Sequence, residues 1–235
     1  SASLVGSEMC IRDRFKAGEK MSNIRIFVSH RIDIDSETVD TPVYFPVRCG
    51  AVYDEEGNSE IQGDDTGDNI SKLRMSFCEF TVQYWAWKNV DADYYGLCHY
   101  RRYLSFSDKR YKNTAFNMVR ELRLTAHEKK KYHLDDTKKI NIVVQKYDMI
   151  IPELAKASEM SYNRAEVKTL REMWESYNGV YFEQGIIDKM FSLIKEYSPE
   201  YYNSACEYFS GKYHRAFNCY IMKKELFVRM CCLLY

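Results

Sequence analysis

The chain has 235 residues, of which 46% are hydrophobic and 29% charged, a composition typical of a globular protein with a sizeable core. Its formal net charge is zero, so we expect no nucleic-acid partner, because proteins of that class carry a basic excess. Eight cysteines without a C-x-x-C pair argue against a structural zinc site and favour reduced thiols in a cytoplasmic protein. No apolar run is long enough for a transmembrane helix.

Both ends of the chain look foreign to the fold. Residues 1–14 show no helical or strand periodicity and resemble translated sequencing-adapter text, as do residues 232–235. We therefore expect residues 1–20 to be a non-native or disordered tail. One domain should cover residues 21–231, truncated at its C-terminus.

Short β-branched and aromatic runs alternate with amphipathic stretches along this domain. We expect extended segments or strands at residues 24–29, 41–47, 93–98, 140–151 and 217–222. We expect helices at residues 77–89, 115–133, 163–176, 183–197 and 199–209, and a last helix opening at 223. Ser76 and Glu79 match a capping box for the first helix. The alternation predicts an α/β fold with a mixed, mostly parallel sheet flanked by helices.

Basic side chains follow two of the expected strands. The sequence His99-Tyr100-Arg101-Arg102 comes directly after residues 93–98, and His30 and Arg31 follow residues 24–29. Ligands bind at the carboxyl ends of strands in open α/β sheets. Arginine forms bidentate hydrogen bonds to phosphate oxygens, and histidine can act as a general acid or base. The pattern fits a nucleotide-diphosphate site, and the alternative is a surface cluster of ion pairs.

Two acidic clusters are candidates for sugar or metal contacts. The loop at residues 64–69 carries three aspartates and could bind a divalent cation or sugar hydroxyls, or could be a solvated loop that caps a helix. Asp91 and Asp93 form a D-x-D triplet, a candidate metal site for Mn²⁺ or Mg²⁺. The triplet precedes its strand rather than following it.

Two further patterns leave alternatives open. Trp85 and Trp87 lie close together on an expected helix and are either core residues or a platform for a sugar ring. The three lysines at residues 129–131 lie between His127 and His133. They form either a solvated helix face or a contact with acidic lipid head groups or a lipid-linked diphosphate.

Taken together, these stretches resemble a known bacterial family. The matching segments are IRIFVSHRID, GDDTGDNIS, CEFTVQYWAWKN, DYYGLCHYRRYL, YDMIIP and FNCYIMKKELF, across about residues 22–230. The family is long catalogued as a domain of unknown function and occurs in capsular and exopolysaccharide gene clusters. The resemblance implies a glycosyltransferase of the GT-A type with a single nucleotide-binding domain.

The resemblance and the local chemistry together give hypotheses for individual residues. The candidate catalytic residues are Asp148, Asp68 and His99. The candidates for binding the donor diphosphate are His30, Arg31, Asp65, Gly67, Asn69, Arg101 and Arg102. The candidates for binding sugar are Glu79, Tyr84, Trp87, Lys88, Tyr100 and Asn218. Many GT-A enzymes end the corresponding strand in a D-x-D metal site, whereas this strand ends in HYRR, which favours cationic side chains over a metal.

The predicted function is transfer of a sugar from a nucleoside-diphosphate sugar to a glycan or lipid-linked glycan. The pathway would be capsular, exopolysaccharide or lipopolysaccharide synthesis, at the inner face of the plasma membrane with a peripheral membrane contact. One rival is a nucleotidyl or phosphosugar transferase, which needs the same phosphate contacts. The other is a non-catalytic carbohydrate-binding module.

Overall fold

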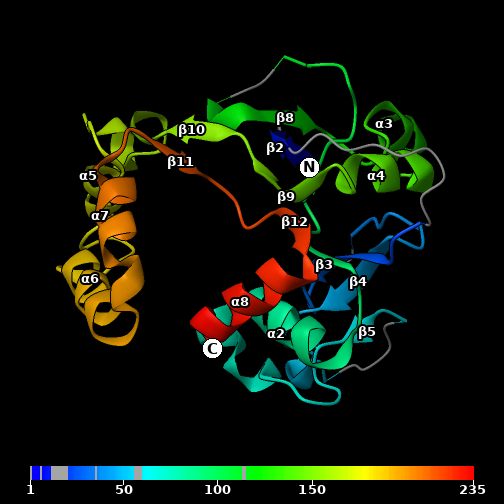
Figure 1. Ribbon diagram of the computed structural model, residues 1–235, viewed down its shortest axis with the longest axis horizontal. Helices are drawn as coiled ribbons and strands as arrows, with labels where there is room; N and C mark the ends of the chain where they lie inside the picture. The colour runs from blue at the N-terminus through cyan, green and yellow to red at the C-terminus, as the bar shows by residue number, and fades with distance from the viewer. Residues whose placement is uncertain (1, 6, 12–20, 35, 56–59, 113–114) are drawn as a thin grey trace. The chain divides into compact units, whose positions relative to one another are not determined.

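The computed structural model (Figure 1) describes residues 2–5, 7–11, 21–34, 36–55, 60–112 and 115–235. The chain forms two compact units, where the sequence suggested one domain. Unit 1 comprises residues 1–112, 118–152 and 217–235, and unit 2 comprises residues 113–117 and 153–216.

Unit 1 is built on a mixed sheet. Its main strand order is β2 (Ser7–Ile11), β9 (Tyr147–Pro152), β12 (Tyr220–Lys223), β6 (Tyr94–His99), β3 (Ile24–His30), β4 (Tyr44–Arg48) and β5 (Gln62–Gly63). The strands from β6 to β5 are parallel, and those from β2 to β6 are antiparallel. The sheet extends through β7 (Arg102–Leu104), β1 (Ala2–Val5) and β8 (Met118–Glu121). The α/β fold with a mixed sheet and flanking helices is confirmed.

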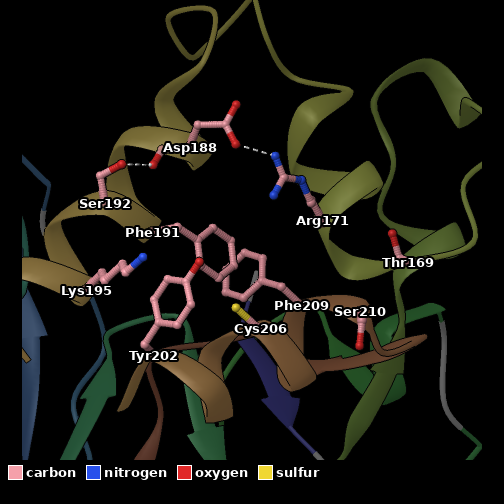
Figure 2. Close-up of a pocket in the computed structure, with 10 residues that line it drawn as sticks. All are labelled: Thr169, Arg171, Asp188, Phe191, Ser192, Lys195, Tyr202, Cys206, Phe209 and Ser210. Carbon is pink, nitrogen blue, oxygen red and sulfur yellow. Dashed lines mark hydrogen bonds and ion pairs between the residues drawn. The ribbon is translucent and has the colours of Figure 1, made fainter. Parts of the chain in front are cut away.

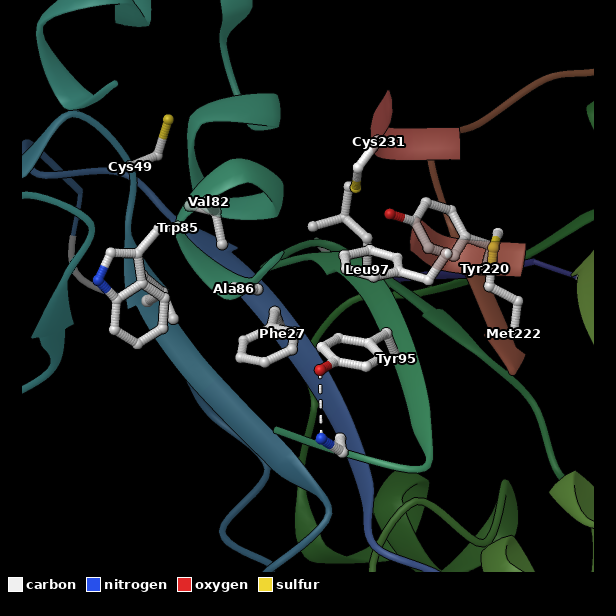
Figure 3. Close-up of a cluster of buried hydrophobic side chains, with 13 residues drawn as sticks. Phe27, Cys49, Val82, Trp85, Ala86, Tyr95, Leu97, Tyr220, Met222 and Cys231 are labelled. Carbon is white, nitrogen blue, oxygen red and sulfur yellow. Dashed lines mark hydrogen bonds between the residues drawn. The ribbon is translucent and has the colours of Figure 1, made fainter. Parts of the chain in front are cut away.

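The helices of unit 1 are α1 (Arg74–Phe77), α2 (Phe80–Asn89), α3 (Ala126–Lys131), α4 (Thr137–Val144) and α8 (Lys224–Leu234). Figure 3 shows the core that α2 and α8 share with the sheet. In this core the rings of Tyr95 and Phe227 stack with centroids 4.3 Å apart. Trp85 is 5% exposed and belongs to the same core, which decides between the two interpretations of that tryptophan.

Unit 2 is a small helical unit with one two-stranded sheet. Strand β10 (Leu154–Lys156) pairs antiparallel with β11 (Tyr213–Arg215). The helices are α5 (Leu170–Glu175), α6 (Ile186–Tyr197) and α7 (Tyr202–Ser210). Ala157, Leu170 and Met173 form the buried centre of this unit.

Three of the expected segments differ in the structure. Residues 118–121 are a strand, so the helix expected over 115–133 is limited to α3. Residues 137–144 form α4, and the Asp136 side chain caps it by accepting from the backbone N–H of Lys139 at 2.9 Å. The strand expected from residue 140 begins at Tyr147. In the stretch 163–176 only residues 170–175 are α-helical.

The expected capping box does not form. Cys78 has a φ of 47°, which separates α1 from α2. Glu79 precedes α2 without a capping bond from its side chain. That carboxylate is therefore available for other contacts.

Two short strands of the N-terminal stretch pair with the sheet of unit 1. Strand β1 pairs with β7 and β8, and β2 pairs with β9, although residues 1–14 show no periodicity. Residues 12–20 lie outside the described part of the chain. The seven cysteines from Cys49 onward are free. No helix among the described residues is long and apolar enough to span a membrane.

Candidate functional site

The HYRR sequence forms the turn between β6 and β7. His99 is the last residue of β6 and lies opposite Arg102, the first residue of β7. Residues directly opposite each other in an antiparallel pair share one face of the sheet. The turn therefore presents His99 and Arg102 side by side at the carboxyl end of the parallel strands, where the sequence predicted them.

Strand β3 brings His30 to the same edge. Ser29 is in register with His99, and the backbone N–H of Tyr100 donates to the Ser29 carbonyl at 3.0 Å. The Tyr100 ring lies near both imidazoles, with its centroid 4.3 Å from that of His99 and 6.1 Å from that of His30. Buried His30 also contacts the hydroxyl of Ser36 through Nδ1, at 2.7 Å. Two strands far apart in sequence thus build one cluster.

His99 is neutral at physiological pH. Burial, and then the positive charge of Arg102, lower its pKa to about 4, although nearby Glu79 acts in the opposite direction. The backbone N–H of Arg101 points at Nδ1 at 3.4 Å, so Nε2 carries the proton of the neutral ring. The neutral ring therefore offers a hydrogen-bond donor rather than a positive charge at this edge.

The positive charge at this edge comes from Arg101 and Arg102. The Arg101 guanidinium lies 5.1 Å from the centroid of Tyr100, and that of Arg102 lies 4.8 Å from Phe217. Neither forms an ion pair with a carboxylate in the part of the chain that the structure describes. Arg31 differs, because its Nε donates to Asp33 at 2.8 Å, so this arginine is already occupied.

Glu79 and Asn218 complete the cluster. The amide of Asn218 donates to Oε1 of Glu79 at 3.0 Å, and Glu79 influences the pKa of His99. Asn218 precedes β12, whose antiparallel register places that end beside the end of β6. Glu79 and Asn218 lie close together because β12 pairs with β6. These two strands are more than 120 residues apart in sequence, as the register of Tyr220 with Leu97 shows.

The loop at residues 65–69 lies at the other end of α2. Asn89 donates to the Asp68 carbonyl at 2.8 Å, the Tyr84 hydroxyl donates to the Asp68 carboxylate at 3.1 Å, and Trp85 donates to Thr66 at 3.0 Å. Helix α2 has ten residues, so its ends are about 15 Å apart. Gly67 and Asp68 are therefore not joined to the HYRR cluster, whereas Asp65 follows Asp64, whose carboxylate accepts from Thr81 in the first turn of α2.

Asp148 also lies at the opposite edge of the sheet. Its carboxylate pairs with Lys223 at 2.6 Å, and Lys223 is in register with Tyr94 at the start of β6. Five strand residues separate Tyr94 from His99, which is about 17 Å. The antiparallel direction of β9 places Asp148 there, at the opposite edge from His99.

The D-x-D triplet lies at that far edge as well. Asp91 pairs with Lys224 at 2.5 Å, and Asp93 accepts from the backbone N–H of Asn23 at 2.8 Å. Within the described residues, no group of three or more His, Cys, Asp or Glu side chains gathers as a metal-ligand set. Neither aspartate of the triplet therefore lies near the HYRR turn.

Tyr84, Trp87 and Lys88 contact each other and the chain end. The Lys88 ammonium lies 3.8 Å from the centroid of a Trp87 ring. Tyr235 stacks on Trp87 at 6.1 Å and meets Tyr84 edge-on at 5.1 Å. These contacts join α2 to the end of α8 and include no residue of the HYRR cluster.

One residue within the acidic loop has a structural role that its pattern did not reveal. Asp64 is fully buried and accepts from the backbone N–H groups of Gly50 and Ala51, both at 2.9 Å. It also accepts from the hydroxyls of Ser71 and Thr81, both at 2.5 Å. It ties α2 to the loops after β4 and β5.

A separate cleft of about 510 Å³ lies among the helices of unit 2. Figure 2 shows the rings of Phe191, Tyr202 and Phe209 gathered at its centre. At one side Arg171 pairs with Asp188 at 2.5 Å, and the Lys195 ammonium lies 5.6 Å from the Tyr202 centroid. Aromatic faces next to hydroxyl and charged groups suit a sugar ring, but sequence reasoning did not single out this region.

The family model for DUF4422, described as a domain of unknown function, matches residues 25–235. The chain belongs to the DUF4422 family. No curated protein matches the chain. Among solved structures, this DUF4422 chain is similar to the apo structure of the bifunctional glycosyltransferase WbbM, with a TM-score of 0.78 and 26% identity. The match covers 90% of this chain and 36% of that chain.

Proposed function

We propose that this chain is a glycosyltransferase that moves a sugar from a nucleoside-diphosphate sugar to a glycan hydroxyl in capsular, exopolysaccharide or lipopolysaccharide synthesis. The observation that carries the proposal is the pair Arg101 and Arg102, which lacks a carboxylate partner among the described residues and lies at the carboxyl edge of parallel strands. The likeness to a solved bifunctional glycosyltransferase supports the same class of reaction.

The side chains at this edge match the needs of the reaction. A bond forms between the acceptor oxygen and the anomeric carbon of the donor, while the bond from that carbon to the diphosphate breaks. The departing diphosphate gains negative charge, which Arg101 and Arg102 stabilise. Neutral His99 donates its Nε2–H to a phosphate oxygen.

Glu79 is the carboxylate that would serve as catalytic base, the role that the sequence suggested for Asp148 and Asp68. It is the carboxylate beside His99, and Asn218 holds it through the 3.0 Å bond. In this position it accepts the proton of the acceptor hydroxyl or orients that hydroxyl. Tyr100, beside His99, and Asn218, beside Glu79, are the side chains that would contact the sugar. A lipid-linked acceptor would place the reaction at a membrane surface.

Ligand-induced thermal stabilisation tests the proposal. We expect the melting temperature to rise with one of the UDP-, GDP-, CDP- or dTDP-sugars, with or without Mn²⁺, and that donor to yield free nucleoside diphosphate with an acceptor glycan. Release of pyrophosphate would instead favour a nucleotidyl transferase. Stabilisation by glycans but by no nucleotide would favour a carbohydrate-binding module.

A further inference from the structure

A second concave site in unit 1 is lined by basic side chains. It has a volume of about 380 Å³ and lies between α3 and the loop after β7. Its cationic or imidazole side chains are Lys109, His127, Lys130, Lys131 and His133. Its volume falls within the range of small-ligand pockets, roughly 300–1,000 Å³.

The shape of this pocket is fixed by contacts within its walls. The Tyr111 hydroxyl donates to the Lys131 carbonyl at 3.2 Å, and the Tyr111 ring meets that of Tyr132 edge-on with centroids 5.0 Å apart. Ser107 contacts the Tyr111 hydroxyl at 3.3 Å and accepts from the backbone N–H of Lys109 at 3.2 Å. The loop is therefore held against α3, and the exposed Lys109 lines the pocket.

Two of the three consecutive lysines are used by the fold. Lys129 donates to the Thr38 carbonyl at 2.7 Å, and Lys131 pairs with Glu121 at 2.8 Å. The Lys130 side chain, between them, is exposed and lines the pocket.

Two of the acidic groups near the pocket are paired. Asp108, its one acidic lining residue, forms an ion pair with Lys139, and Asp136 lies 3.5 Å from His133. Lys109 and Lys130 have no carboxylate partner within the described ranges. Like charges gathered in a concavity without counter-charge raise the local concentration of anions.

The neighbouring surface adds an apolar element. Leu122 follows Glu121, the partner of Lys131, and is 89% exposed, more than any other large apolar side chain in the described residues. Arg123 follows Leu122, and Arg120 precedes Glu121; both arginines are exposed. An exposed leucine among cations is the pattern of a surface that lies on anionic lipid, with the apolar group reaching the headgroup boundary.

We propose that this face of unit 1 binds an anionic lipid surface, with one headgroup phosphate held in the pocket by Lys109 and Lys130. The phosphate oxygens accept from the two ammonium groups and from the imidazole of His127. The binding face lies on α3 and its neighbouring loop and does not depend on the proposed transfer reaction.

Sedimentation with phospholipid vesicles tests this proposal on the full chain. We expect binding to phosphatidylcholine vesicles that contain phosphatidylglycerol, little binding to pure phosphatidylcholine, and weaker binding as salt rises. Lys130→Gln and Lys109→Gln should each lower the partition coefficient about fivefold. Neither side chain has an ion pair to lose, so circular dichroism should show both variants folded.

The control is Lys72→Gln, an exposed lysine of unit 1 that does not line the pocket; it should leave binding unchanged. An equal loss with Lys72→Gln would overturn the proposal, because the electrostatic attraction to the vesicle would then be spread over the surface.

Thermal stabilisation by inorganic pyrophosphate is the second test. Stabilisation of the parent but not of Lys130→Gln by pyrophosphate, without any vesicle binding, would show a site for a soluble phosphate and would also overturn it.

Discussion

His99 and Arg102 lie directly opposite each other across the β6–β7 turn, and this pairing sets the charge of the site. Burial and the neighbouring guanidinium hold the pKa of His99 at about 4. The imidazole is therefore neutral when both arginines are charged. Phosphate binding at this edge depends on Arg101 and Arg102 for charge and on His99 for a hydrogen bond.

We expect Arg101→Ala or Arg102→Ala to weaken nucleoside-diphosphate binding about tenfold to a hundredfold, since a charge-assisted bond contributes about 1.5–3 kcal/mol. Replacing either arginine by lysine instead of alanine should restore only part of the affinity, because lysine keeps the charge but cannot form the bidentate hydrogen bonds. Calorimetric titration with UDP and GDP measures both effects. Arg229→Ala, at an exposed position on α8, is the matched control. Unchanged affinity in both alanine variants would remove HYRR as the diphosphate site.

The pKa of His99 predicts a pH dependence of stability. Its folded value, about 4, lies below the ordinary 6.5, so between these values the unfolded chain binds more protons than the folded one. Stability should therefore fall as the pH decreases through this window, by about 2 kcal/mol after allowing for partial exposure. Urea unfolding of the parent and of His99→Gln across the window isolates the effect. Identical pH profiles for the two proteins would contradict it.

Glu79→Gln should reduce transfer by at least about a hundredfold if Glu79 acts as the base. Glutamine keeps a carbonyl oxygen to accept from Asn218, so donor binding and melting temperature should change little. The comparison variant is Asp148→Asn, at the opposite edge, which should leave the transfer rate unchanged. Initial rates with the donor found by thermal shift decide between the two carboxylates, and the reverse ranking would restore Asp148.

Asp91→Asn should leave nucleotide-sugar affinity unchanged, with and without Mn²⁺, because Asp91 pairs with Lys224 far from HYRR. The same titration as for the arginine variants provides the measurement. A loss of Mn²⁺-dependent binding in this variant would make the D-x-D triplet a metal site after all.

The buried Asp64 carboxylate accepts four hydrogen bonds. Asp64→Asn replaces one of its oxygens by an NH₂ group, which would face the donors that the oxygen now accepts from. We therefore expect this variant to destabilise unit 1 by at least about 3 kcal/mol. Asp65→Asn, next to it and exposed, should stay within about 0.5 kcal/mol of the parent. Urea unfolding of both variants provides the comparison, and equal losses would show that burial of Asp64 has no special role.

The sequence alone determined the local elements that carry the site. The apolar runs at residues 24–29 and 93–98 predicted β3 and β6, and the position of HYRR directly after the second run placed it at a strand end. These features depend on neighbours along the chain, and a buried strand requires apolar residues in a short continuous run. The same reasoning failed for residues 140–144, because a short apolar run fits a buried helix as well as a strand.

Only the tertiary structure decided which charged groups share an edge. Asp148 and Asp68 were reasonable carboxylates by sequence, yet the antiparallel register of β9 and the hydrogen bonds of the loop to the far end of α2 separate them from His99. Glu79 and Asn218 meet because β12 pairs with β6 across most of the chain. Lys130 remains available to bind phosphate because Lys129 donates to the Thr38 carbonyl and Lys131 pairs with Glu121. Strand direction, register and the pairing of charges are set by packing between distant segments, which local residue patterns do not encode.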